Sequence, residues 1–203
     1  GCTRVALVSL DIIPGIEYAY KREVFDECKP WFQRMTLGTP LVYWQGQEEK
    51  RDDVAEVMAA VARELPARAE DEAVLLMAHG TPHPANAYYA VMQERLENLG
   101  EERVCIYTVE GRPNLDDVVP KLKEAGIRKV TLAPLMLVAG DHATNDMAGD
   151  EPDSHKSLLE REGFCVQTIL KGIGENAAVR KIFATRAAEA YEALLDAAES
   201  KRF

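Results

Sequence analysis

The chain has 203 residues, 47% of them hydrophobic and 29% charged, with a formal net charge of −10 at pH 7. This composition indicates a soluble globular protein, long enough for one large domain or two small ones. The negative charge argues against a nucleic-acid partner and against an anionic membrane surface, because both need clustered Lys and Arg. No apolar run approaches the roughly 18 residues that a membrane span requires.

Cysteine usage favours a reducing compartment. The cysteines are scattered singly, with no Cys-x-x-Cys pair, at Cys2, Cys28, Cys105 and Cys165. We expect them to be reduced, with Cys105 and Cys165 buried in strands, where a free cysteine behaves as a small hydrophobic residue. We therefore expect a cytoplasmic protein. No signal peptide is visible, but the chain begins with Gly1 rather than Met, so an original leader stays an open question.

Short apolar runs alternate with longer amphipathic ones, which is typical of βα units around a parallel sheet. In the first third of the chain the pattern predicts strands over residues 3–10 and 35–42 and helices over residues 15–34 and 52–65. The charged stretch 66–71 is the predicted boundary. We expect a partial N-terminal α/β lobe over residues 1–68 and a complete C-terminal α/β lobe over residues 69–203.

The pattern is clearer in the second lobe. It predicts strands at about 73–78, 103–109, 129–138 and 164–170, and helices at about 84–98, 114–125, 154–162 and 176–198. Four such units form a doubly wound domain with the expected strand order 2-1-3-4. The last helix could pack back on the first lobe.

An internal repeat bears on the first lobe. The segment Val8–Gly15 resembles Ala133–Gly140 in register, each being a strand that ends in glycine. Two βα units precede this strand in the second lobe, and almost nothing precedes it in the first. If the lobes are duplicates, the first lacks two βα units, on the order of 60 residues. Parallel strands also resemble one another by chance, so the repeat alone leaves both interpretations open.

Three metal-binding side chains follow three successive predicted strands. His79 follows the first strand of the second lobe, Glu110 the second and His142 the third. Side chains just beyond the carboxyl ends of parallel strands meet in one crevice, and the expected order makes these strands neighbours. Two imidazoles and a carboxylate there would form an open site for a divalent metal.

Each of these residues also has a structural interpretation. His79 could be a hydrogen-bonded turn residue, His142 could be exposed or a helix cap, and Glu110 could pair with Arg112. The acidic residues of the loop after His142 are expected to be solvated, with Asp146 or Asp153 capping short helices.

The remaining histidines are weaker candidates. His83 lies four residues from His79, but Pro82 and Pro84 disfavour the helical turn that would bring the two together. His155 is expected on the exposed first turn of a helix.

Several segments together resemble the class II tetrapyrrole chelatases, most closely the anaerobic sirohydrochlorin cobaltochelatases of cobalamin synthesis. The resemblance is carried by Leu135–Met147, Ala78–Gly80, Val109–Glu110, Gly172–Asn176, Ile12–Tyr18 and Thr36–Leu41. It runs through essentially the whole chain, and the block around His142 is its most specific part.

The resemblance implies two similar lobes of parallel sheet flanked by helices, with a tetrapyrrole held in the cleft between them. It implies ATP-independent insertion of Co²⁺, as the substrate metal, into sirohydrochlorin, with no nucleotide cofactor. His79, Glu110 and His142 would hold the metal, and the two histidines would also help to remove the pyrrole N–H protons. The absence of a Walker-type phosphate loop agrees with this.

The chain departs from the family pattern in the first lobe. Family members commonly carry His where this chain has Asp11. Because a polyanionic tetrapyrrole and a protein of charge −10 repel each other, local cations or helix N-termini must bind its acid groups, and Arg112 and Lys156 are candidates.

Other functions remain open. The alternatives are insertion of iron or nickel into the same tetrapyrrole, or a non-catalytic tetrapyrrole- or metal-binding protein. A flavodoxin-like nucleotide binder is disfavoured. The sequence leaves open whether the chain forms a homo-oligomer.

Overall fold

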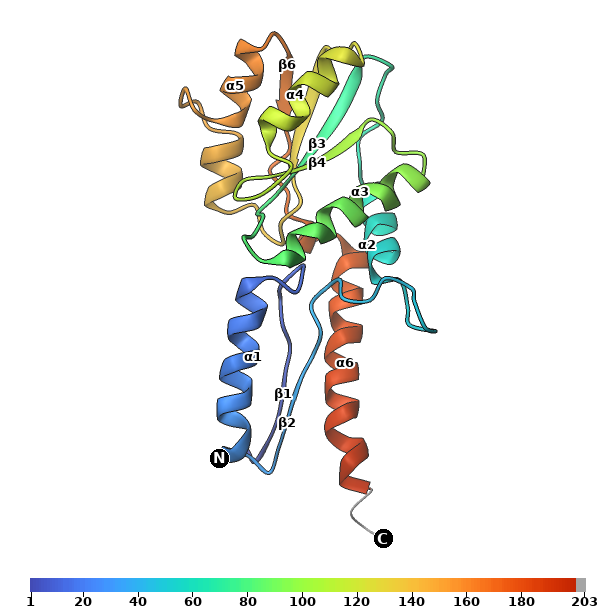
Figure 1. Ribbon diagram of the computed structural model, residues 1–203, viewed down its shortest axis with the longest axis vertical. Coiled ribbons are helices and arrows are strands. Elements are labelled where there is room, and N and C mark those ends of the chain that lie inside the picture. Colours follow the sequence, from blue (N-terminus) through green and yellow to red (C-terminus); the bar gives the residue numbers. More distant parts are fainter. Residues whose placement is uncertain (200–203) are drawn as a thin grey trace.

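The computed structural model describes residues 1–199, with side chains to residue 195, and contains two separate parallel β-sheets. Figure 1 shows the larger sheet and its helices as one part of the molecule, with the smaller sheet beside it between two long helices. Parallel strands need crossover connections, and helices supply them in both sheets.

The larger sheet has four strands in the order β4-β3-β5-β6. Its elements are β3 (Glu72–Ala78), α3 (Tyr88–Asn98), β4 (Val104–Thr108), α4 (Leu115–Glu124), β5 (Lys129–Pro134), α5 (His155–Arg161) and β6 (Cys165–Thr168). Successive side chains of β3 point to opposite faces. Val74 and Leu76 therefore join the core beneath α3, whereas Leu75 and Met77 join a second core beneath α4 and α5. The central strands are thus buried on both faces, as in doubly wound folds.

The smaller sheet pairs β1 (Arg4–Leu7) with β2 (Arg34–Leu37) in parallel. The connection between them is α1 (Ile16–Cys28), which gives way to a 3₁₀ turn over Lys29–Trp31. Pro30 lies in that turn, where it lacks the N–H needed to continue the helix. Only Tyr18 of α1 is buried, so this part of the molecule has a much smaller core than the larger sheet.

One helix contacts both sheets. The first half of α6 (Ala177–Glu199) places Val179 and Ile182 in the core beneath the larger sheet. Its second half runs beside the smaller sheet (Figure 1), where the Thr36 hydroxyl donates a 2.6 Å hydrogen bond to the carbonyl of Ala190. The relative position of the two sheets is therefore fixed largely by α6.

A buried ion pair joins α6 to α2 (Asp53–Ala62). The Asp53 carboxylate accepts a 2.7 Å hydrogen bond from the guanidinium of Arg186, and these side chains are 0% and 1% exposed. Asp53 also accepts backbone N–H bonds from Tyr43 and Trp44 at 3.0 and 2.8 Å. A buried carboxylate costs much free energy unless it is fully hydrogen-bonded, so this network explains how Asp53 is accommodated. It ties the loop after β2, the start of α2 and the middle of α6 together.

The predicted α/β fold is confirmed, including the 2-1-3-4 order of the strands in the second half of the chain. The largest differences are at the ends of three strands, since β1 ends at Leu7, β2 at Leu37 and β5 at Pro134, each before the predicted end. Gly38 and Pro40 interrupt β2, so β1 loses its partner there. The Leu135 N–H still donates to the carbonyl of Met77 at 2.7 Å, and beyond it the carbonyls of Met136 and Leu137 accept hydrogen bonds from the segment after β6. The division at residues 68/69 and the absence of two βα units stay predictions.

The expectation that Cys105 and Cys165 are both buried was wrong. Cys165 is exposed and Cys105 half-buried rather than both buried, because β6 and β4 are the edge strands of the larger sheet. All four cysteines are free.

Within residues 1–199, no helix combines the length and apolar character needed to cross a membrane.

Replacing Asp53 with Ala should lower the free energy of unfolding by about 3–5 kcal/mol, because it leaves the Arg186 guanidinium buried without its carboxylate. Urea denaturation measures this loss. Glu64→Ala is the control, since Glu64 pairs with Lys171 at the surface and is 41% exposed, and it should cost less than about 1 kcal/mol. Equal losses in the two variants would show that the buried pair does not hold α2 to α6.

Candidate metal centre

The ladder between β3 and β4 continues beyond the ends of both strands. The Val109 N–H donates to the carbonyl of Ala78 at 3.0 Å, and the Glu110 N–H donates to the carbonyl of His79 at 2.8 Å. His79 and Glu110 are therefore neighbours across the ladder, at the carboxyl edge of the sheet. This is the edge at which ligand sites form in open α/β sheets.

A glycine allows this close approach. Gly80 has a φ of +87°, and a Cβ there would lie 2.7 Å from the backbone nitrogen of Gly111 and 2.9 Å from the carbonyl carbon of Glu110. The turn after β3 can thus contact the backbone of the turn after β4 because residue 80 carries no side chain.

His142 comes from the segment after β5. The N–H groups of Ile173 and Gly174 donate to the carbonyls of Met136 and Leu137 at 2.8 and 2.9 Å, which holds this segment beside the β6–α6 connection. A π-helix follows over His142–Met147, a rare geometry that occurs frequently at functional sites.

The π-helix is anchored on its inner side. Ala143 and Met147 are 0% exposed and belong to the core beneath α4 and α5. His142 directly precedes Ala143, and its side chain lies close to His79 and Glu110 at the ends of β3 and β4.

The structure brings His79, Glu110 and His142 together. Each offers one ligand atom, and the three atoms lie within 4.8 Å of one another. The imidazole centroids of His79 and His142 are 4.9 Å apart, and Nδ1 of His79 is 3.9 Å from a carboxylate oxygen of Glu110. Ligand atoms about 2.1 Å from a divalent ion lie roughly 3.0–3.5 Å apart, so small rotations of these partly exposed side chains suffice to enclose an ion.

The two imidazoles have different hydrogen-bond partners. Nδ1 of His79 lies 3.1 Å from the carbonyl of Gly80, whereas Nδ1 of His142 lies 2.5 Å from the carboxylate of Asp146. Sequence reasoning assigned Asp146 to solvent or to a helix cap and missed this contact. The four-residue spacing from His142 to Asp146 is the signal that could have found it, because residues so spaced share a face of a helical turn.

Of the three candidate ligands, His79 lines a cavity between the two parts of the molecule. This cavity has a volume of about 260 Å³ and is lined by Leu10, Asp11, Ile12, Ile13, Glu17, His79, Gly80, Tyr89, Leu135, Met136 and Leu137. Much of its wall comes from the segment after β1 and the segment after β5, the two segments that resemble each other in sequence. Asp11 faces this cavity as expected, but its carboxylate is bound by Ser9 and Lys21, both at 2.5 Å.

A second cavity of about 650 Å³ shares Leu10 and Leu137 with the first. Around it, large apolar side chains lie open to solvent: Leu10 is 61% exposed, Val138 70% and Leu170 50%. Arg180 is the cation in its lining. Exposed apolar side chains gathered around a concave surface are typical of ligand-binding sites.

The other candidate residues lie elsewhere. The Nδ1 atom of His83 accepts the N–H of Ala85 and caps the following turn. Arg112 pairs with Asp117 at 2.6 Å rather than with Glu110, and Lys156 pairs with Asp150 at 2.7 Å. Neither cation is thus free of a carboxylate partner.

The prediction for His155 was wrong in one respect. The residue begins α5, but it is half-buried rather than exposed, and its Nδ1 lies 2.9 Å from the hydroxyl of Tyr107. Burial lowers the pKa of His155, and the nearby Asp146 carboxylate opposes this shift. Burial also raises the pKa of Tyr107, which is 0% exposed. The pair is therefore a neutral hydrogen bond inside the protein near pH 7.

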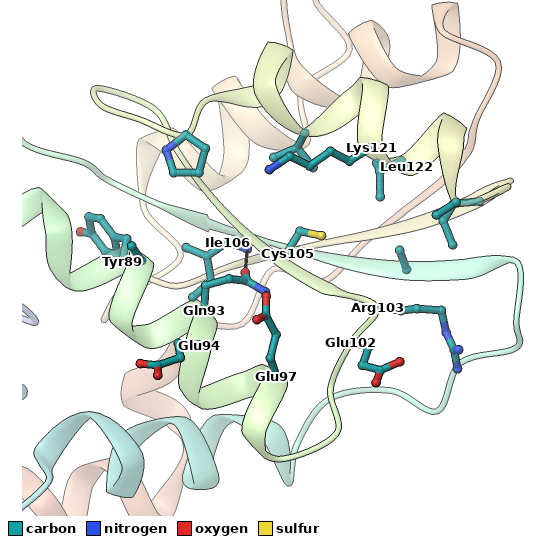
Figure 2. A pocket seen from close by; sticks show the side chains of 16 residues that line it. Tyr89, Gln93, Glu94, Glu97, Glu102, Arg103, Cys105, Ile106, Lys121 and Leu122 are labelled. Carbon is teal, nitrogen blue, oxygen red and sulfur yellow. Dashed lines mark hydrogen bonds between the residues drawn. The ribbon is translucent and has the colours of Figure 1, made fainter. Parts of the chain in front are cut away.

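A further hollow, of about 510 Å³, lies over β4 between α3 and α4 and includes none of the three metal-binding residues in its lining. Figure 2 shows Gln93 reaching from α3 to the exposed edge of β4. Its side chain accepts the Ile106 N–H at 2.8 Å and donates to the Val104 carbonyl at 2.9 Å. Gln93 thus occupies hydrogen-bonding groups of the edge strand that another chain could otherwise pair with.

Comparison with known proteins identifies the family. A family model described as "Cobalt chelatase (CbiK)" matches residues 1–192. The chain belongs to the cobalt chelatase family. The resemblance to class II chelatases inferred from the sequence is thereby confirmed.

Relatives in this family are longer. The sirohydrochlorin cobaltochelatase of Salmonella typhimurium is 37% identical over 183 residues, which is 90% of this chain and 67% of that protein. Sirohydrochlorin cobaltochelatase CbiKC of Nitratidesulfovibrio vulgaris is 39% identical over 176 residues, which is 85% of this chain and 60% of that protein. The chain thus spans about two thirds of the length of the first and less of the second.

A solved structure supports the fold. SirB from Bacillus subtilis with Fe³⁺ has a TM-score of 0.65 to this chain at 18% sequence identity. The match covers 94% of this chain and 72% of that one.

Gly80→Ala should displace the Glu110 turn, because its Cβ would overlap the backbone of residues 110 and 111. We expect Co²⁺ binding to weaken about 10-fold or more, as when a group that supports metal ligands is lost. Isothermal titration with Co²⁺ measures this. Gly126→Ala is the matched control, since Gly126 has a φ of +72° but open space around it. Equal Co²⁺ affinity in the two chelatase variants would contradict the role given to this contact.

The burial of His155 predicts a pH dependence of stability. Because folding lowers the pKa of His155, the unfolded chain binds a proton more readily below about pH 6.5. Its contribution to stability is thus full above that pH and is lost as the pH falls. The free energy of unfolding, measured in urea, should fall more between about pH 7.5 and pH 5.5 in the wild type than in His155→Gln. The same dependence of the unfolding free energy on pH in the wild type and in His155→Gln would contradict this prediction.

Proposed function

We propose that this chain inserts Co²⁺ into sirohydrochlorin without ATP, with His79, Glu110 and His142 as the residues that hold the ion. The observation that carries the proposal is the cluster of three ligand atoms within 4.8 Å, beside a cavity with exposed apolar walls. Membership of the cobalt chelatase family supports it. The free cysteines fit the reducing cytoplasm, which we propose as the compartment.

The three proposed ligands suit a metal ion that binds to the protein and is then transferred to the substrate. Imidazole and carboxylate groups bind divalent first-row metals such as Co²⁺. Three protein ligands leave coordination positions open for water and then for the incoming pyrrole nitrogens. The partial exposure of His79 and Glu110, at 41% and 54%, allows the ion to exchange these ligands for ring nitrogens.

The walls of the cleft suit the macrocycle. A tetrapyrrole is a broad ring system that would cover the exposed apolar side chains of Leu10, Val138 and Leu170 on binding, which is favourable because it removes apolar surface from water. The cavity that these residues border adjoins the one containing His79.

Local cations would offset the negative charge of the protein. Arg180 lines the larger cavity, and its guanidinium is bound by two backbone carbonyls, from Gly174 and Glu175, rather than by a carboxylate. A bidentate guanidinium suits a substrate carboxylate. Lys21 is a second cation near the cleft, although it shares its charge with Asp11.

Insertion releases two pyrrole protons for each ion transferred, and the histidines are placed to take them. While an imidazole nitrogen binds Co²⁺, its lone pair is engaged. When the ion moves to the ring nitrogens, the same lone pair becomes free and can accept the proton that a pyrrole N–H gives up. Histidine suits both roles because it changes its charge near neutral pH.

Replacing His79 or His142 with Ala should slow metallation by about 100-fold or more, the range typical of a lost general base. The absorbance change on mixing the protein, Co²⁺ and sirohydrochlorin measures the rate. His83→Ala is the control, because His83 caps a turn and should leave the rate unchanged.

Full rates in both His79→Ala and His142→Ala would overturn the site. Competition among Co²⁺, Fe²⁺ and Ni²⁺ in the same assay identifies the metal, because intrinsic affinities alone do not select it. Tight binding of sirohydrochlorin with no metallation would indicate a carrier instead of a chelatase.

A further inference from the structure

The hydrogen bond between His142 and Asp146 is built into the π-helix that carries both residues. Nδ1 of His142 lies 2.5 Å from the Asp146 carboxylate, four residues further along. A parallel contact joins Asn145 to Asp141 at 2.6 Å across the same spacing. The inner side of the turn is fixed by the fully buried Ala143 and Met147. The geometry of the pair therefore comes from the backbone and does not depend on a bound ion.

Asp146 is available to His142 alone. Of the neighbouring acids, Asp150 is paired with Lys156 and Asp141 with Asn145. In the part of the chain whose side chains are described, Asp146 forms an ion pair with His142 and with no lysine or arginine. Its other neighbour is His155, whose pKa it raises from a distance.

An ionised carboxylate only accepts hydrogen bonds. The nitrogen facing Asp146 must therefore carry the proton, so Nδ1 of His142 is the N–H donor. A neutral imidazole has one N–H and one lone pair, and the lone pair is then left on Nε2. Without the carboxylate, the two tautomers would compete and the ring would be free to rotate.

We infer that Asp146 is a positioning residue that fixes the orientation and tautomer of His142, so that its Nε2 is the nitrogen that binds Co²⁺ and later takes a pyrrole proton. The metal and proton roles rest on the proposed function, whereas the tautomer does not. Carboxylates that accept the second N–H of a metal-binding histidine raise its basicity as a ligand.

The inference makes the two imidazoles unequal. Nδ1 of His79 lies 3.1 Å from the carbonyl of Gly80, and the nearest carboxylate oxygen, from Glu110, is 3.9 Å away and beyond hydrogen-bond distance. A bond to a charged acceptor is roughly twice as strong as a neutral one, so His142 is the more firmly oriented of the two.

The tautomer can be read directly in the metal-free protein. Long-range ¹H–¹⁵N correlation spectra distinguish the protonated from the unprotonated ring nitrogen, and the chain has only four histidines. His142→Ala assigns the signals by their loss. We expect the wild type to show Nδ1–H at His142 and Asp146→Ala to show a mixture of tautomers. An unchanged tautomer in Asp146→Ala would overturn the inference, whether or not the protein is a chelatase.

Metal binding gives the second readout. Asp146→Ala should bind Co²⁺ about 10- to 100-fold more weakly and change the visible ligand-field spectrum of the bound ion. Asp146→Asn keeps the shape of the side chain but adds an NH2 donor that can bond to an unprotonated Nδ1, so it should also lose the fixed Nδ1–H tautomer. Glu151→Ala is the control, because it removes one charge from the same loop at an exposed position. Equal affinities in Asp146→Ala and Glu151→Ala would contradict the assignment.

Discussion

The site depends on the register of the parallel ladder around β3. Met77 pairs with Tyr107 on one side and with Pro134 on the other, which aligns the ends of three strands. Because side chains alternate along a strand, a shift of one residue would turn the buried faces outward. The two cores of the larger sheet therefore enforce the register, and the register determines that His79 and Glu110 leave the sheet side by side. The metal-binding cluster is in this sense a consequence of core packing.

The features that were predicted from the sequence are those that depend only on the alternation of strands and helices and on where each strand ends. Apolar runs identified the strands, and the parallel arrangement followed from the helices between them. The convergence of His79, Glu110 and His142 then needed only the end of each strand, and the structure brings the three together. An error of a few residues in a strand boundary does not change which edge of the sheet a following side chain occupies. This explains why β5 could be predicted too long without moving His142 out of the site.

What the sequence did not predict arises from contacts between distant segments or from unusual backbone geometry. The π-helix over His142–Met147 has no established sequence signal, so Asp146 was interpreted as a solvated acid. The partner of His155 is Tyr107, a strand residue 48 positions earlier, and only the tertiary fold brings that hydroxyl to the first turn of α5. The need for glycine at position 80 was also not predicted, because it depends on the backbone of residues 110 and 111.

The walls of the cleft come largely from two segments whose sequences resemble each other. The segment after β5 leads into the π-helix and carries His142, a proposed metal ligand, while the segment after β1 supplies Asp11, held by Lys21. Both offer apolar walls, and α6 fixes their separation by entering the core of the larger sheet and running beside the smaller one. The buried pair of Asp53 and Arg186 sets the position of α6 against α2. The packing of α6 thus contributes to the distance across the cleft, while the side chains of His79 and Glu110 remain partly exposed.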